Sequence, residues 1–246
     1  MIREHIPRIG LLGVVIACCV ASTATAQEIS LDLGATALSD RAIQLFLLVT
    51  VLSIAPGIAM MITCFPFIVT VFAILRQAIG LQQSPPNMLL ISLALFLTYF
   101  IMEPVFTDAW ENGIAPMLNA EFEAEEGLRR AIAPFRSFMI TRIDPETFLR
   151  LSELRPQTSG MAVNADAPLS LIVPSFLLSE LSRAFQVGFV LFLPFLIIDL
   201  VVAAVLMSMG MMMVPPAVVA LPFKLAFFVV ADGWTLISDS LIRGYF

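Results

Sequence analysis

Apolar residues come in long uninterrupted runs along most of this chain. No charge occurs from Ala42 to Leu75, and a second run covers Met88 to Met102. A helix needs roughly 20 apolar residues to cross the hydrocarbon core of a bilayer, so the first run holds one span plus an extension. Pro56-Gly57 and Pro66 lie inside that run and predict a kinked or broken helix, buried within an assembly. The second run is expected to end as a helix near Glu103-Pro104.

Turn residues separate these two runs, because Gly80 to Asn87 contains Ser84-Pro85-Pro86-Asn87. Toward the carboxyl end, the apolar runs are broken only by Asp199 and Lys224. Two helices joined near Met213 to Pro216 are the simplest interpretation, because Pro215-Pro216 ends a helix. We therefore expect Met211 to Met213 to lie at or beside a tight turn.

The middle of the chain is polar, with ten acidic residues and six arginines between Asp108 and Pro168. Asn119 is a candidate cap for a helix with acidic first turns and basic later turns, the order that the helix dipole favours. Asp144-Pro145-Glu146 indicates another helix start, and Arg155 to Pro168 has the composition of a loop.

These patterns predict an all-α membrane-associated protein with two long, broken helical hairpins flanking a small polar helical subdomain. The expected segments are a cleaved signal peptide (1–26), a polar amino-terminal tail (27–41), a first apolar hairpin (42–104), a periplasmic polar subdomain (105–170) and a second apolar hairpin with a methionine-rich loop (171–246).

Composition agrees with a membrane protein, since 59% of the 246 residues are hydrophobic and only 13% are charged. The formal net charge is -6, and Lys224 is the only lysine. The chain has no basic stripe of the kind that binds nucleic acid, so no nucleic-acid partner is expected.

The amino end has the layout of a secretory signal: arginines in a short polar region, an apolar run from Ile9 to Val20, and Ala24-Thr25-Ala26 as a cleavage site. Cleavage would leave Gln27 first. Val15-Ile16-Ala17-Cys18 also resembles a lipoprotein processing box, which would acylate Cys18 instead. Either route sends the new amino terminus across the bacterial inner membrane.

Cleavage after Ala26 would remove His5, Cys18 and Cys19 and leave Cys64 alone in an apolar run. An intrachain disulfide and a metal site of the Cys/His kind are then excluded. We expect Cys64 to be a small buried hydrophobic residue, and no metal or cofactor to be bound.

Charges inside apolar runs are costly and usually find partners within a bundle. Asp199 and Lys224 are therefore predicted to form a structural charge pair that holds one hairpin together; the alternative is a proton or ion relay. Glu180 and Arg183, three residues apart on a helix, are expected to pair at the solvated end of that helix. The sequence motifs of nucleotide-binding loops, serine hydrolases and zinc proteases are absent, so an enzyme is not expected.

Several segments resemble the FliP family of flagellar type III export-gate proteins, and the resemblance covers the chain from about Leu45 to its end. The segments that carry it are Pro174 to Leu181, Arg183 to Phe189, Pro194 to Leu200, Met211 to Pro216, Ala220 to Leu225 and Asp232 to Trp234, with weaker matches at Leu75 to Gly80 and Pro85 to Asn87.

The resemblance implies a ring of five copies that assembles with FliQ and FliR into a helical, cone-like gate, with FlhA and FlhB as further partners and unfolded flagellar proteins as cargo. It implies that Met211, Met212 and Met213 project into a pore as a deformable gasket, and that Phe138 contributes to an apolar plug. An injectisome-type gate subunit, a small-solute or proton-coupled transporter and a purely structural scaffold are the alternatives.

Three positions depart from the family's pattern. Phe67 after Pro66 stands where the family has an arginine after a threonine, Glu103 replaces a small residue before Pro104, and Ser175 replaces an alanine. These departures could change how the first hairpin packs. None of them lies in the segment Met211 to Pro216.

Overall fold

The structure is a computed structural model, and it describes residues 35–81, 85–211 and 213–246. The predicted signal peptide, the alternative processing site at Cys18 and the start of the polar tail lie outside the described residues. The chain divides into two compact units, residues 1–51 and 52–246. The five segments expected from the sequence stay a prediction.

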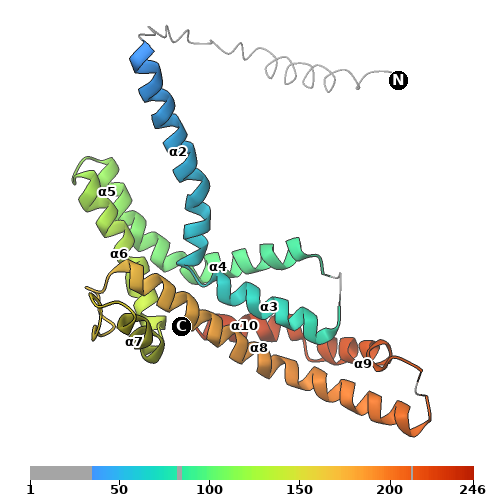
Figure 1. The fold of residues 1–246 in the computed structure, drawn as a ribbon. Coiled ribbons are helices and arrows are strands. Elements are labelled where there is room, and N and C mark those ends of the chain that lie inside the picture. The colour runs from blue at the N-terminus through green and yellow to red at the C-terminus, as the bar shows by residue number, and fades with distance from the viewer. Residues whose placement is uncertain (1–34, 82–84, 212) are drawn as a thin grey trace, which may run out of the picture. The chain divides into compact units, whose positions relative to one another are not determined.

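All regular elements among the described residues are helices, as the apolar patterns predict (Figure 1). In chain order they are α2 (Ala35–Met61), α3 (Phe65–Ile79), α4 (Asn87–Ala109), the π-helix η1 (Trp110–Ile114), α5 (Ala115–Leu118), α6 (Ala124–Arg142), α7 (Pro145–Glu153), α8 (Leu169–Ser208), α9 (Pro216–Val230) and α10 (Gly233–Arg243).

The first long apolar run is broken, and the break lies between α2 and α3. Pro66 falls in the first turn of α3, where the missing N–H has no helical partner to lose. The Thr63 hydroxyl covers part of the gap by accepting a hydrogen bond from the Phe65 N–H at 3.4 Å. Pro56-Gly57, the other expected break, lies within α2. A break is thus confirmed beside Pro66, whereas the helix is continuous through Pro56-Gly57.

Helix α3 lies at the centre of the core of the second unit and packs against α4, α8 and α9. Its neighbour Cys64 is fully buried, as expected. Close approach of α8 depends on Gly188, because a Cβ there would lie 2.5 Å from the Ile74 Cδ1. Helix α10 closes the core through Trp234, whose ring packs edge-on against Phe72 and Phe228.

The polar subdomain begins differently from what the sequence predicts. Helix α4 does not end near Glu103 but continues through Pro104 to Ala109 and into η1. The prediction was wrong because a long apolar helix tolerates one interior proline when neighbouring elements pack along it, and α4 lies against α6. Asn119 follows α5 as its carboxyl cap, whereas α6 begins after Glu123.

The next two predictions for this region are confirmed. Asp144 caps α7, because its carboxylate accepts hydrogen bonds from the Thr147 N–H at 2.9 Å and the Thr147 hydroxyl at 2.7 Å. Residues 155–168 form the expected loop.

Helix α8 is the longest element, with 40 residues, and it passes through Pro174 and Pro194. Helix α9 returns beside its far end (Figure 1). Three stretches among the described residues are long and apolar enough to cross a membrane: Arg41–Met61, Asn87–Leu118 and Leu169–Ser208. Helices α9 and α10, bent by 60° at their junction, would add a fourth if the pair forms one span.

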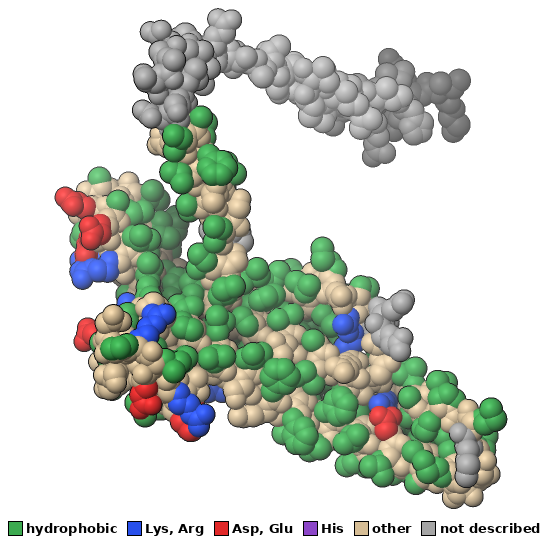
Figure 2. Space-filling view, in the orientation of Figure 1, with side chains coloured by type: hydrophobic (Ala, Val, Ile, Leu, Met, Phe, Trp, Pro, Cys, Tyr) green, Lys and Arg blue, Asp and Glu red, His purple; other side chains and the backbone are tan. Residues whose placement is uncertain are grey.

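The surface of the second unit is divided by residue type. In Figure 2, most charged side chains gather over α5 to α7, whereas hydrophobic side chains are spread along α8 and α9, with few charges among them. The polar subdomain and the apolar hairpin therefore meet different surroundings.

Candidate functional site: the methionine turn and two buried ion clusters

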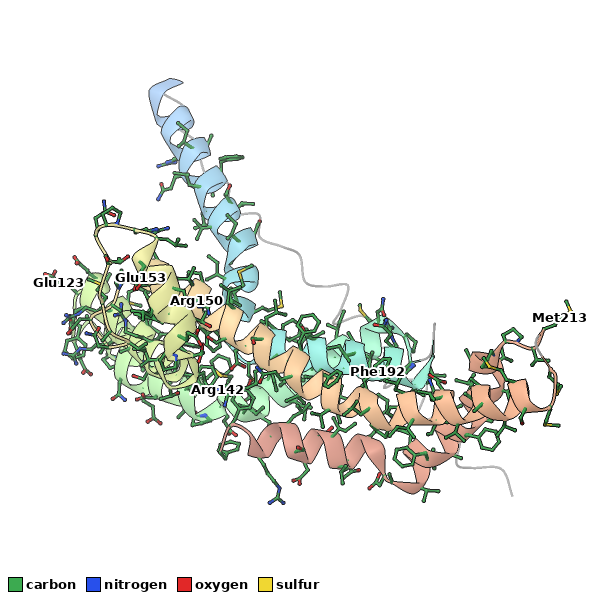
Figure 3. The ribbon with its side chains drawn as sticks, turned by 60° about the horizontal axis from the view of Figure 1, so that its bottom comes forward. Glu123, Arg142, Arg150, Glu153, Phe192 and Met213 are labelled. Atoms are coloured by element: carbon green, nitrogen blue, oxygen red, sulfur yellow. The ribbon has the colours of Figure 1, made fainter. Side chains whose placement is uncertain are left out.

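The turn between α8 and α9 presents methionine side chains at an exposed tip (Figure 3). Helix α8 ends in a Schellman motif, in which the Gly210 N–H donates to the Met207 carbonyl and the Met211 N–H donates to the Leu206 carbonyl, both at 3.0 Å. Gly210 adopts a φ of 75°, a left-handed angle that favours glycine. Pro215 and Pro216 then start α9 at once. This local chemistry fixes a short, sharp turn.

Met213 is 97% exposed and Met211 is 43% exposed. Met207, in the last turn of α8, and Met209, which caps the helix, are exposed as well. Met212 lies outside the described residues. The expectation that Met211 and Met213 lie at a tight inter-helix turn is confirmed. Flexible, polarisable thioethers in this position form an apolar surface that adapts to the shape of what it contacts.

Asp199 and Lys224 lie at the root of this hairpin. The Lys224 Nζ is 2.7 Å from the Asp199 Oδ2 and donates a second hydrogen bond, at 3.0 Å, to the Ala78 carbonyl. That carbonyl belongs to the last turn of α3, where helical partners are missing and a cation is favoured by the helix dipole. The lysine thus joins α3, α8 and α9, which is a structural role.

The two members of the pair differ in exposure. The Lys224 side chain is nearly buried, whereas 35% of the Asp199 side chain is exposed. The Asp199 Oδ1 is nevertheless inaccessible and accepts no hydrogen bond from the described residues. The pair is therefore asymmetric: the lysine makes two hydrogen bonds, whereas only one of the two aspartate oxygens has a partner among the described residues.

A second ion cluster surrounds Glu180. Its Oε1 is 3.1 Å from the Arg142 Nε and 3.0 Å from the Arg183 Nη1, and its Oε2 accepts a hydrogen bond from the Tyr245 hydroxyl. The Glu180 side chain is fully buried. The expected pairing of Glu180 with Arg183 is confirmed, but its expected place at a solvated helix end is wrong. Helix α8 begins at Leu169, so Glu180 lies inside the helix, buried beneath α6 and the carboxyl-terminal residues.

Sequence reasoning missed Arg142 and Tyr245 as members of this cluster. Arg142 lies 38 residues and Tyr245 lies 65 residues from Glu180, so no local spacing links them. The available signal was indirect: a carboxylate inside a long apolar helix requires more than one neutralising partner.

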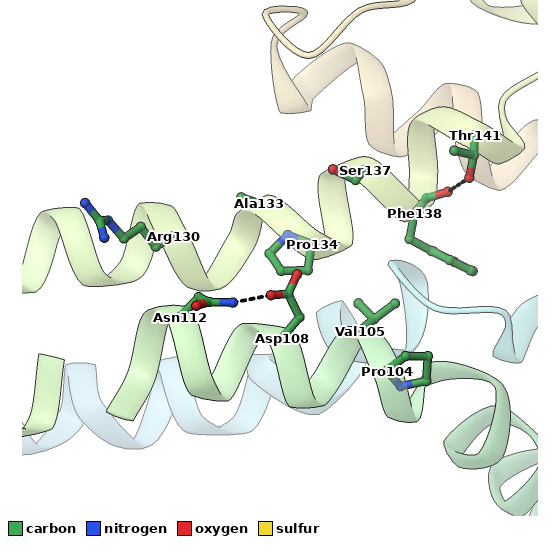
Figure 4. Close-up of a pocket in the computed structure, with 10 residues that line it drawn as sticks. All are labelled: Pro104, Val105, Asp108, Asn112, Arg130, Ala133, Pro134, Ser137, Phe138 and Thr141. Carbon is green, nitrogen blue, oxygen red and sulfur yellow. Dashed lines mark hydrogen bonds between the residues drawn. The ribbon is translucent and has the colours of Figure 1, made fainter. Parts of the chain in front are cut away.

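Phe138, the expected plug residue, packs between two aromatic rings. Its ring centroid lies 5.8 Å from that of Phe176 and 6.1 Å from that of Tyr245. It also lines a groove of about 790 Å³ between α4 and α6, shown in Figure 4, where Pro104 and Pro134 lie within the two facing helices. The structure thus links Phe138 to the Glu180 cluster through Tyr245. Arg142, a member of that cluster, lies far from Met213 at the methionine turn (Figure 3).

Comparison with known proteins agrees with the resemblance seen in the sequence. The FliP family matches residues 48–241. The chain is 47% identical to the flagellar biosynthetic protein FliP of Caulobacter vibrioides, over 98% of this chain and 92% of the relative. It is 46% identical to the protein of that name from Rhizobium meliloti, over 82% and 83%, and 44% identical to that from Bacillus subtilis, over 82% and 91%. With a match of this extent, an all-helical fold and apolar helices long enough to span a bilayer, the chain belongs to the FliP family of flagellar membrane proteins.

Proposed function

We propose that this chain is the pore-forming subunit of a flagellar type III protein export gate, and that the methionine turn is its seal. The observation that carries the proposal is the exposure of Met211 and Met213 at the tip of the α8–α9 hairpin. A ring of such tips, one from each of five copies, would form an apolar constriction. Narrow apolar constrictions resist water and ions by dewetting, and flexible thioethers can yield around an unfolded chain of varied side chains.

Partners and orientation are part of the same proposal. FliQ and FliR complete the cone-like gate, FlhA and FlhB belong to the surrounding export apparatus, and the polar subdomain lies on the periplasmic side of the inner membrane. The apolar surface of α8 and α9 supports this arrangement, because so extensive an exposed apolar surface is typical of interaction sites.

The proposal predicts that replacing Met211, Met212 and Met213 together by alanine permits assembly but raises ion leakage through the membrane. Conductance of cells or vesicles carrying the complex measures this. Met207→Ala/Met209→Ala is the matched control, because it removes exposed thioethers one turn before the tip. A tight seal in the triple variant, with export unchanged, would favour the scaffold alternative instead.

Stoichiometry is tested by native mass spectrometry of the complex purified in mild detergent from cells that also express the presumed partners. A mass that matches five copies with the smaller subunits supports the gate, and the subunit mass fixes the processing site. A monomer or dimer without partners would favour the transporter alternative.

A further inference from the structure

The last residues of the chain return to the polar subdomain after α10 has ended at Arg243. Tyr245 makes contacts of three kinds there. Its hydroxyl donates to the Glu180 Oε2, its ring lies 4.1 Å from the Arg142 guanidinium carbon, and its ring stacks on Phe138 at 6.1 Å between centroids. A fourth contact is edge-on to Phe67 at 5.8 Å. One side chain therefore touches α3, α6 and α8.

The backbone adds to this attachment. The Arg142 Nη1 donates to the Gly244 carbonyl at 2.8 Å, so the guanidinium makes hydrogen bonds to both the carboxyl-terminal segment and Glu180. Charge-assisted hydrogen bonds of this kind are stronger than neutral ones. Burial, followed by the negative charge of Glu180, raises the pKa of the Tyr245 hydroxyl above its ordinary range, so the hydroxyl stays protonated and remains a donor.

Neighbouring residues show that these contacts belong to Gly244 and Tyr245 and not to the terminus in general. The Phe246 side chain is exposed. Arg243 pairs with Asp239 of its own helix, also at the surface. Only the two residues between them enter the cluster.

We propose that Gly244 and Tyr245 form a carboxyl-terminal clasp that locks the end of α6 onto α8 and holds Phe138 between Phe176 and Tyr245. Movement of this part of α6, and of Phe138 with it, requires the clasp to open. Tyr245 is a positioning residue: it acts on α6 through Arg142 and on the α4–α6 groove through Phe138. The clasp does not depend on the proposed export function, because every contact lies within one chain.

Amide hydrogen exchange tests the clasp in the full chain, purified in mild detergent as the assembly in which it is isolated. Tyr245→Ala removes the hydroxyl and the ring. We expect exchange of residues 138–143 to accelerate by tenfold or more, while that of residues 71–79, the part of α3 beyond the Phe67 contact, changes by less than twofold. Phe246→Ala is the matched control, since it shortens the adjacent aromatic residue, and its exchange should equal that of the wild type.

Tyr245→Phe separates the two kinds of contact, because it keeps the ring stack and loses only the hydroxyl. We expect a rise of about threefold, confined to residues 138–143, and this variant also decides the matter if Tyr245→Ala does not fold. Unchanged exchange in residues 138–143, or an equal rise throughout α3, α6 and α8, would overturn the clasp. Ion leakage of the same variants is a separate measurement, so that failure of the gate function leaves the exchange result intact.

Discussion

The two ends of α8 are held in different ways. In its first half, Glu180 pairs with Arg142 of α6 and Arg183 of α8 and accepts a hydrogen bond from Tyr245 near the carboxyl terminus. Near its end, a single pair, Asp199 with Lys224, ties the hairpin to α3, and beyond it α8 and α9 expose apolar side chains up to the methionine turn. The polar groups around Glu180 find their partners within one chain, whereas the far end of α8 presents an apolar surface that other molecules can cover.

Along α8, therefore, the part around Glu180 serves stability, and the part near the methionine turn is available for contacts with partners. Polar networks in which every group is satisfied rigidify a fold and specify one arrangement. A hairpin with few partners of its own is free to adopt the packing that its neighbours impose, and exposed apolar patches of this extent commonly mark contacts with protein or lipid. Substitutions should therefore cost most where they cut the hairpin from the rest of the fold, and least at solvated helix ends.

The largest effect is expected at the root of the hairpin. Lys224→Met leaves the Asp199 carboxylate and the Ala78 carbonyl without their donor. Breaking a buried pair costs about 3–5 kcal/mol, and partial exposure of Asp199 reduces this to about 2–3 kcal/mol. The apparent melting temperature in detergent should fall accordingly.

Two control variants test whether the loss of stability in Lys224→Met comes from the unpaired charge. Arg243→Met removes one member of the exposed Arg243–Asp239 pair and should leave the melting temperature almost unchanged, because solvent screens such a pair. The double change Asp199→Leu/Lys224→Met replaces both charges by apolar groups and should recover most of the loss. A double variant less stable than Lys224→Met alone would contradict the structural role of the pair.

Replacing a glycine by alanine in the polar subdomain and in the α8–α9 turn compares how tightly the two regions are packed. A Cβ at Gly113 would lie 2.5 Å from the Ala131 backbone nitrogen, so Gly113→Ala must push η1 away from α6. Overpacking of this kind costs about 1–3 kcal/mol. Gly210→Ala meets no atom within 4 Å and strains only a backbone with φ of 75°, at about 1 kcal/mol.

Thermal unfolding of the two variants side by side measures the difference. Gly113→Ala should melt at the lower temperature, because its obstacle is backbone and not a flexible side chain. Equal melting temperatures would mean that the polar subdomain is as loosely packed as the hairpin.

Much of this architecture follows from sequence pattern. The helix-breaking prolines at 215 and 216 and the Asp144 cap act through local chemistry, which a sequence displays directly. The charges at 199 and 224 could be paired because they are the only two that break the last apolar runs. The same patterns mislead at Pro104, where packing against α6 carries a helix through a proline, and at Asn119, which follows α5 instead of starting α6. Local preference there is outweighed by tertiary contacts.

The Glu180 cluster could not be predicted from the sequence for a related reason. Its members come from three distant segments, and each alone has an ordinary local explanation. Arg142 is a basic residue at the end of a helix, and Tyr245 is a polar aromatic residue near a terminus. Only the folded chain shows that they meet at one carboxylate.

The smallest effect is expected at the amino end of α7, in the solvated part of the polar subdomain. Hydrogen bonds from the Thr147 hydroxyl and the Thr147 N–H hold the pKa of the Asp144 carboxyl below its ordinary value. A carboxyl whose pKa is lower in the folded state than in the unfolded state stabilises the fold above the unfolded value, about 3.9. That contribution is lost as the pH falls from about 4 through the lower folded value.

Asp144→Asn isolates this titration, because asparagine is an equally good cap but has no proton to gain. The wild-type protein should lose slightly more stability than Asp144→Asn between pH 5 and pH 3, as compared by melting temperature at each pH. Glu126, whose pKa is also lowered, by Arg130 and Arg129, titrates in both proteins, so its effect cancels in the difference. Parallel pH profiles would show that the cap contributes equally in both protonation states, and that the solvated end of the polar subdomain, unlike the Glu180 cluster, does not depend on charge.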